Sequence, residues 1–409
     1  MSYLKPNNMG IIACPGGEVF ADEIISFLKF TYSRKFEKQV SSLSEIYDIE
    51  KTEVVRKINF FLDTEVFKKE KIRDSAGFSS PLLKLPVRFT HFANGEFKAE
   101  ILKSVRGMDI FVIQDVENRY PLSFCGDHDK KLSVNDHVMC LFVVIDAALQ
   151  AGARSVSIVI PTYPFARQHK KKGREALTAS WFGRVLEFSG VARIITLDIH
   201  SKEIENTFRN LRLENLHASY QIIRKLTELI DLKSEDIVVV SPDTGAVDRN
   251  KFYAGNLQSP LAVLYKERDY SRVSRNAREN NITNVRLLGS VKGKTVFMAD
   301  DLLGTGGTLI KAIRFLRDQG ANKIICAISL PLFSGDAVRY FDEAFKEGLF
   351  FRIIGTNAVY HGEELLKKEW YESVSISNLF ARIIAHLHHN RSLSSLLDNR
   401  KIIQRLLKQ

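Results

Sequence analysis

The chain has 409 residues, of which 45% are hydrophobic and 26% charged, a composition typical of folded proteins and unlike that of disordered chains. This length excludes a small disulfide-stapled domain and predicts about two or three domains. The 59 basic and 48 acidic residues give a net charge of +11, which favours nucleic acid, a membrane surface or a polyphosphate as partner unless the whole proteome is basic.

The sequence predicts neither a membrane-spanning nor a secreted protein. Its apolar runs are shorter than the ~18 residues that a membrane span needs, and an aspartate interrupts the run Leu141–Leu149. The first six residues lack the layout of a secretory signal. The four cysteines have no paired spacing for zinc or redox chemistry: Cys14, Cys125, Cys140 and Cys326. We therefore expect a cytoplasmic protein with reduced core thiols and no membrane partner.

Residues 31–85 have the first distinctive pattern along the chain. They are charged and serine-rich at both ends, and they show helical periodicity around Ile46, Val54, Val55 and Ile58 without strand alternation. This pattern predicts a helical insertion on the surface of the protein.

Three later stretches each combine an amphipathic helix, a small-residue turn and a nearly continuous apolar strand, at residues 143–161, 185–200 and 312–331. Gly152, Gly190 and Gly320 stand where a helix end needs positive φ, and continuous apolar strands are typical of sheets covered on both faces. The first and third stretches are alike, which suggests a duplication. We predict an α/β fold with two similar domains, residues 1–214 and 215–409, each a mainly parallel sheet flanked by helices.

Charge is concentrated in two segments, Arg167–Arg174 and Lys266–Arg278. Neither contains the interleaved aromatic residues of a surface that stacks single-stranded bases, so we expect no nucleic-acid partner. Taken alone, each segment is more typical of a solvated face than of a binding site.

The strongest chemical signal is the segment Thr295–Lys311. An apolar strand ends in Asp300 and Asp301, and a loop of small residues, Gly304-Thr305-Gly306-Gly307-Thr308, leads into a helix. In open α/β sheets ligands bind beyond the carboxyl ends of strands, and backbone N–H groups at a helix start bind phosphate. Adjacent carboxylates need partners such as ribose hydroxyls or a cation. The segment therefore predicts a sugar-phosphate site.

Acid-acid, a short spacer and Thr-Gly-Gly-Thr resemble the phosphoribosyl-diphosphate fingerprint of type I phosphoribosyltransferases. Further motifs occur in the order seen in ribose-phosphate pyrophosphokinases, and together they cover nearly the whole chain except residues 31–85 and a stretch around 116–133. These motifs are Phe92–Glu96, Ala166–Gln168, Asp198–His200, Pro242–Arg249 and Lys266–Arg268.

This resemblance implies transfer of the pyrophosphoryl group of ATP to the 1-hydroxyl of ribose 5-phosphate, giving 5-phosphoribosyl 1-diphosphate and AMP, with Mg²⁺ as cofactor and a homo-oligomer, a hexamer in the family. It also implies the roles of single residues. Phe92, Asn94 and Glu96, supplied by a neighbouring subunit, and Arg167 and Gln168 would contact ATP; His200 and Asp243 would attend the metal; Lys266 and Arg268 would be catalytic; Arg268, Asp300, Asp301, Gly304, Thr305, Gly306, Gly307 and Thr308 would bind ribose 5-phosphate.

Three positions depart from the family pattern. Gly304 replaces the usual aspartate beside the 5-phosphate, Ala246 replaces a glycine after Asp243, and Asn94 replaces the commoner aspartate, although an amide still donates and accepts hydrogen bonds. The first two departures leave open a catalytically weak or silent subunit that regulates a true synthetase. A salvage phosphoribosyltransferase is the other alternative, although the motifs at Phe92–Glu96 and Arg167–Gln168 favour ATP.

Overall fold

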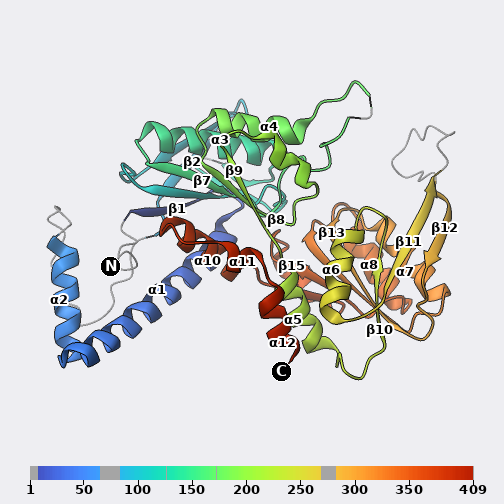
Figure 1. Cartoon of the computed structure of the whole chain (residues 1–409). Coiled ribbons are helices and arrows are strands. Elements are labelled where there is room, and N and C mark those ends of the chain that lie inside the picture. The colour runs from blue at the N-terminus through green and yellow to red at the C-terminus, as the bar shows by residue number, and fades with distance from the viewer. Residues whose placement is uncertain (1–7, 65–82, 126, 172, 269–281, 409) are drawn as a thin grey trace.

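The computed structural model describes residues 8–64, 83–125, 127–171, 173–268 and 282–408, with the side chains of 59–64, 127–128, 266–268 and 282–284 left aside. Two β-sheets organise these residues (Figure 1). Every strand of the first sheet ends by residue 216, and every strand of the second begins after residue 236.

The first sheet has five parallel strands. In spatial order they are β1 (Met9–Ala13), β4 (Asp109–Ile113), β7 (Ser155–Val159), β8 (Arg193–Leu197) and β9 (Arg212–Leu216). Helices α3 (Val134–Gln150) and α4 (Thr178–Phe188) bury their apolar residues in the core of this half. Two antiparallel pairs stand outside the sheet: β2 (Val87–His91) with β3 (Phe97–Ile101), and β5 (Leu122–Phe124) with β6 (Asp127–Lys130).

The second sheet has seven strands. In spatial order they are β12 (Ile282–Leu288), β11 (Leu261–Arg268), β10 (Ile237–Ser241), β13 (Thr295–Leu303), β14 (Lys323–Pro331), β15 (Arg352–Thr356) and β16 (Tyr371–Val374). Only β12 is antiparallel to its neighbour. The helices of this half are α5 (Ser219–Leu229), α6 (Val247–Leu257), α7 (Gly307–Asp318), α8 (Ala337–Lys346) and α9 (Gly362–Leu366). The predicted fold class, two mainly parallel sheets with flanking helices, is confirmed.

The glycines chosen from the sequence end helices as predicted. Gly152, Gly190 and Gly320 have φ of 82°, 87° and 85°, and each lies just beyond a helix, α3, α4 and α7 respectively. A residue with a Cβ is strained in this left-handed region, whereas glycine is not. These positions therefore fix where each helix turns toward its following strand.

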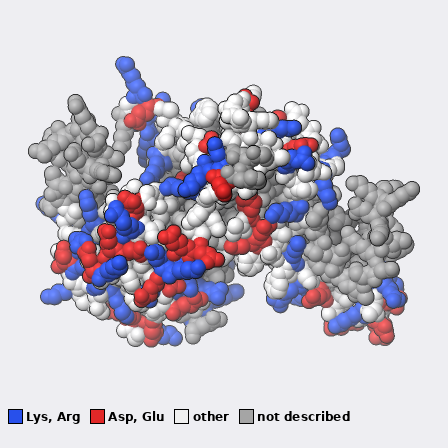
Figure 2. All heavy atoms as spheres, turned by 180° about the vertical axis from the view of Figure 1, so that it is seen from behind, with Lys and Arg blue, Asp and Glu red and all other residues white. Residues whose placement is uncertain are grey.

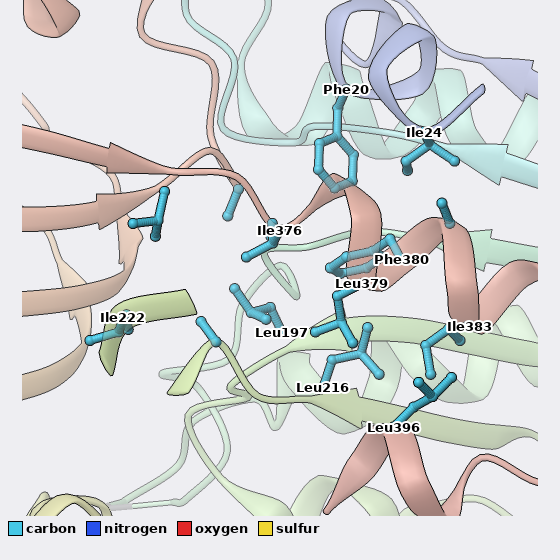
Figure 3. Packing of buried hydrophobic residues seen from close by; sticks show 14 of the residues in the cluster. Phe20, Ile24, Leu197, Leu216, Ile222, Ile376, Leu379, Phe380, Ile383 and Leu396 are labelled. Carbon is cyan, nitrogen blue, oxygen red and sulfur yellow. The ribbon is translucent and has the colours of Figure 1, made fainter. Parts of the chain in front are cut away.

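A shared core joins the two halves. Helix α1 (Glu18–Tyr47) packs against α10 (Ser377–His388), with the rings of Phe20 and Phe380 5.3 Å apart. Figure 3 shows Ile376 and Phe380 pointing toward Phe20 of α1 and toward Leu197 at the end of β8. One continuous cluster of buried apolar residues thus reaches strands of both sheets, so the halves are held in one arrangement by the hydrophobic effect.

The far half of α1 and α2 (Lys51–Thr64) occupy the predicted helical segment. Phe36 and Val40 of α1 pack against Val54 and Val55 of α2 in a small separate core, and Figure 1 shows the pair projecting away from both sheets. Ile46, used above as a sign of periodicity, is 68% exposed. The remaining part of the predicted insertion, residues 65–82, lies outside the described residues.

The cysteine prediction needs one correction. Cys14, Cys140 and Cys326 are buried thiols, whereas Cys125 is exposed because it lies beside the β5–β6 turn and not in a core. All four are free. Within the described segments, no helix combines the length and apolarity that crossing a membrane requires.

Candidate active site

A cavity of about 1830 Å³ lies where the two sheets meet. Its walls come from segments that follow β8 of the first sheet and β10 and β13 of the second, all at the carboxyl ends of parallel strands. This is where open α/β sheets place their ligands. The wall includes most of the residues predicted from the sequence: Arg167, His200, Asp243, Asp300, Asp301, Gly304, Thr305, Gly306 and Thr308.

Asp300 and Asp301 lie on the cavity wall near the end of β13. Burial raises the pKa of Asp300, and the neighbouring Asp301 charge raises it further. Burial would also raise the pKa of Asp301, but a hydrogen bond with His200 and the charge of Arg249 outweigh it and lower that pKa. His200 Nδ1 lies 2.6 Å from Asp301 Oδ2. The pair thus combines one ionised acid with one that readily holds a proton.

Asp198 joins the two sheets beneath this pair. The buried carboxylate accepts a hydrogen bond from Ser329 Oγ at 2.6 Å and lies 2.6 Å from His217 Nδ1. Burial acts to raise the pKa of Asp198, and His217 together with Arg249 reverses that effect and lowers it. Ser329 belongs to β14, while Asp198 follows β8, so this contact joins the two halves beside the cavity.

Arg249 is a site residue whose role the sequence did not predict. Its Nη1 is buried and has no hydrogen-bond partner among the described residues, and it lies 3.9 Å from Asp301 Oδ1. Burial would lower the pKa of Arg249, but Asp198, Asp301 and Asp300 raise it. Such an unsatisfied cationic donor on a cavity wall suits an anionic or hydroxyl-bearing ligand. The motif Pro242–Arg249 contained the signal, but only the fold brings its last residue beside the acids.

The small-residue loop 304–308, called the cradle below, has a backbone shape that glycine makes possible. Gly306 has φ of 77° and directly precedes α7, and a Cβ there would lie 2.5 Å from Phe341 Cε2. Only glycine therefore fits at this position. Thr305, Gly306 and Thr308 line the cavity, so the start of α7 lies at its wall, where the helix dipole favours an anion.

Gly304, the first departure from the family pattern, lies beside Arg167. A Cβ on Gly304 would lie 3.6 Å from Arg167 Nη1, which is an ordinary contact distance. The position thus has room for a side chain facing a guanidinium. The departure at position 246 has a simpler outcome: Ala246 has φ of −91° and donates its N–H to Asp243 Oδ1 at 3.0 Å, so no glycine is needed.

Comparison with known proteins decides the family. A family model of the N-terminal domain of ribose phosphate pyrophosphokinase matches residues 69–190, and one of the phosphoribosyl transferase domain matches residues 210–347. The chain is 32% identical over 311 residues to ribose-phosphate pyrophosphokinase A of Dictyostelium discoideum, covering 76% of this chain and 89% of the relative. The chain belongs to the ribose-phosphate pyrophosphokinase family.

Other relatives in this family agree. The ribose-phosphate pyrophosphokinase of Bacillus subtilis is 32% identical over 311 residues, covering 76% of this chain and 88% of that protein. The crystal structure of phosphoribosylpyrophosphate synthetase from Mycobacterium smegmatis aligns with a TM-score of 0.66 and 25% identity, covering 94% of this chain and 99% of that one. The match over nearly the whole of that structure includes both sheets.

Several residues implied by the family resemblance lie away from the cavity. Phe92, Asn94 and Glu96 form the turn between β2 and β3, where Asn94 Oδ1 accepts the N–H of Glu96 at 3.2 Å, and they do not line the cavity. Gln168 is exposed beside Arg167 but is not on the wall, and neither is Gly307. The backbone of Lys266 and Arg268 belongs to β11; their side chains lie outside what the structure describes.

The residues around the cavity fit Mg²⁺ in one particular way. Within the described ranges, no group of three or more His, Cys, Asp or Glu residues could hold a metal ion unaided. His200, Asp243 and the acid pair nevertheless share one wall. Mg²⁺ retains several waters and prefers substrate phosphate oxygens over a cage of protein ligands. This donor set therefore fits a magnesium ion that arrives with a nucleotide.

Surface charge gives no sign of a nucleic-acid site on the face shown in Figure 2. There the described Lys and Arg side chains are interspersed with Asp and Glu over both halves of the molecule. Nucleic-acid binding surfaces gather basic residues in a patch or stripe. The net positive charge is therefore not focused on this face.

Proposed function

We propose that this protein transfers the pyrophosphoryl group of ATP to the 1-hydroxyl of ribose 5-phosphate, forming 5-phosphoribosyl 1-diphosphate and AMP. Family membership supports the reaction, and one observation carries it at the level of the site. The acid pair Asp300–Asp301 and the loop 304–308 share a single cavity with cationic and metal-compatible residues of the other half. A sugar phosphate and a nucleotide are thus given adjoining places.

The sugar phosphate is assigned to the second half. Backbone N–H groups of the loop 304–308 bind the 5-phosphate at the start of α7. Asp300 and Asp301 accept hydrogen bonds from ribose hydroxyls, with Asp301 held in place by His200. Arg249 keeps the paired acids from repelling one another, because its guanidinium is buried against them.

The reaction requires positioning and charge neutralisation above all. The 1-hydroxyl oxygen bonds to the β-phosphorus of ATP while the bond from that phosphorus to the α-phosphate oxygen breaks. AMP leaves with the bonding electrons, and the hydroxyl proton passes to solvent. Lys266 and Arg268 supply cations where negative charge accumulates; β11 pairs in parallel with β10, so both residues extend beyond the edge where the cavity lies.

Mg²⁺ would be held by His200 and Asp243 through water and by the nucleotide phosphates, and when bound it supplies charge neutralisation and orientation of the triphosphate. Arg167, on the cavity wall with Lys170, binds ATP from the first half together with Gln168. The residues 1–214 and 215–409 thereby act as a nucleotide half and a sugar half.

The test is release of AMP from ATP, Mg²⁺ and ribose 5-phosphate by the purified protein. We expect AMP and 5-phosphoribosyl 1-diphosphate in equal amounts, both abolished when ribose 5-phosphate is omitted. Substrate binding without AMP release would point instead to a silent regulatory subunit. Formation of a nucleoside monophosphate from 5-phosphoribosyl 1-diphosphate and a free base would point to a salvage transferase.

We further propose that a second copy of the chain completes the nucleotide site with Phe92, Asn94 and Glu96. Their turn lies away from the cavity of their own chain, and Phe92 is 43% exposed. A mixing experiment tests this: Phe92→Ala and Asp301→Asn proteins, each with strongly reduced activity alone, should regain activity when dissociated and reassembled together. Without such complementation the turn does not serve a neighbour's site.

A further inference from the structure

A segment after β4 ties the first half to the loops that surround the sugar-phosphate cradle. Asp115 Oδ2 accepts the backbone N–H of Tyr360 at 2.8 Å. The hydroxyl of Tyr120 donates to the carbonyl of His361, and the rings of Tyr120 and Tyr360 pack edge to face with centroids 5.0 Å apart. The segment 115–120, at the start of the stretch outside the family resemblance, therefore reaches across the seam between the halves.

Arg119 extends this contact to the cradle itself. Its Nη2 donates to Ser334 Oγ at 2.8 Å and to Glu117 Oε2 at 3.1 Å. The backbone N–H of Ser334 in turn donates to the carbonyl of Gly304 at 3.0 Å. Gly304 is the first residue of the phosphate loop, so two hydrogen bonds separate the guanidinium of Arg119 from the backbone of the cradle.

Glu117 orients Arg119. Its Oε2 accepts the hydrogen bond from Arg119 Nη2 at 3.1 Å. Burial raises the pKa of Glu117, and the hydrogen bond and the charge of Arg119 oppose that rise. The Glu117 side chain is only 13% exposed, so its charge is poorly screened by solvent. Glu117 therefore provides a fixed negative charge that holds the Arg119 guanidinium toward Ser334.

We propose that Glu117 and Arg119 are positioning residues for ribose 5-phosphate: Arg119 holds the 304–308 loop through Ser334, and Glu117 orients Arg119. Neither residue lines the cavity, so both act through the loop. This inference rests on the proposed function, because it assigns the sugar phosphate to that loop.

The experiment compares Glu117→Gln, Arg119→Met and Arg119→Lys with wild type. Removing the charge of Glu117 or the donor of Arg119 should raise the KM for ribose 5-phosphate about tenfold with a smaller change in kcat, in the range expected for losing one charged hydrogen bond. Arg119→Lys keeps a cationic donor for Ser334 and should recover most of the affinity. Arg314→Met, which breaks an exposed ion pair with Glu347 at 2.8 Å on α7, is the matched control and should leave KM unchanged.

A second arm removes the group that Arg119 contacts. Ser334→Ala should raise the KM for ribose 5-phosphate as Arg119→Met does, and the double variant should be no worse than either single variant, because both changes remove the same hydrogen bond. An unchanged KM in both single variants, with only a lower Tm, would reduce the segment to a structural brace and overturn the proposal. Additive rises in KM in the double variant would overturn the role given to the Arg119–Ser334 hydrogen bond.

Ribose 5-phosphate binding measured by calorimetry, without ATP, separates this proposal from the proposed function. Should the wild type bind the sugar phosphate but release no AMP, the proposed reaction fails. The calorimetric affinities of the same variants would still decide the role of Glu117 and Arg119.

Discussion

The carboxyl ends of β4 and β13 hold equivalent places in the two halves, since each is an inner parallel strand followed by a helix and strand of similar sequence. Both ends carry acids. Asp115 after β4 is buried and accepts the N–H groups of Tyr360 and Glu117. Asp300 and Asp301 at the end of β13 line a cavity instead.

The difference shows that acids at equivalent strand ends can have two different roles. At β4 the acid satisfies backbone donors and fastens the seam between the halves. At β13 the acids meet a cation and a histidine but keep oxygens toward the cavity. Equivalent strand ends thus carry acids in both halves, and the contacts around each acid decide whether it is used up by backbone donors or lines the cavity.

The largest effect is expected from a substitution at the carboxyl end of β13. Asp301→Asn keeps the shape of the side chain but removes the charge that pairs with His200 and Arg249, so kcat for AMP release should fall by about 100-fold, as when a group that stabilises the transition state is lost. Steady-state kinetics measure this, with Asp318→Asn, an exposed acid at the end of α7, as control. Equal losses in both variants would contradict a special role for the β13 acids.

A smaller effect is expected at the cradle. Gly306→Ala puts a Cβ 2.5 Å from Phe341 in the left-handed region, which costs about 1–3 kcal/mol of strain. We expect the KM for ribose 5-phosphate to rise by roughly tenfold or more while ATP binding changes little, because the loop moves to relieve the contact. Gly173→Ala, where nothing lies within 4 Å, should match wild type. A selective loss of ATP affinity would contradict the assignment of this loop to ribose 5-phosphate.

The smallest effect concerns the β4 end and its dependence on pH. Burial raises the pKa of Asp115 from 3.8 to about 7, so the folded state keeps a proton that the unfolded state releases. This contribution therefore lowers the free energy of unfolding as pH rises from 3.8, and the loss is complete above about 7.

The Asp115→Asn variant has no carboxyl group to ionise at this position. It therefore lacks the part of the fall in unfolding free energy with pH that Asp115 causes. Urea unfolding at the two ends of this pH range should show that the free energy of unfolding of the variant increases relative to that of wild type as pH rises. Parallel slopes for the two proteins would mean that Asp115 is ionised when folded.

Much of this molecule follows from local sequence. The turns at Gly152, Gly190 and Gly320 are set by backbone sterics, and so is the turn at Gly306, which also has a positive φ. What escaped prediction depends on contacts between distant segments. Arg249 gains its role by burial against acids about fifty positions later in the sequence, and the Arg119–Ser334 bond crosses the seam between the halves. Neither hydrophobic periodicity nor a local motif predicts a contact between segments so far apart in the sequence.

The exposure of Cys125 is a second feature that the sequence alone did not predict. A cysteine is usually buried, and only the placement of the β5–β6 turn decides otherwise. The turn at Phe92–Glu96 lies away from its own cavity, so its predicted nucleotide contact depends on a second chain and not on the fold of this one.

A crystal structure of the protein with ribose 5-phosphate tests the account most directly. We predict the 5-phosphate on the backbone N–H groups of residues 304–308 and the ribose hydroxyls on Asp300 and Asp301. Ribose 5-phosphate bound at any other place, with this loop and acid pair making no contact to it, would contradict the account.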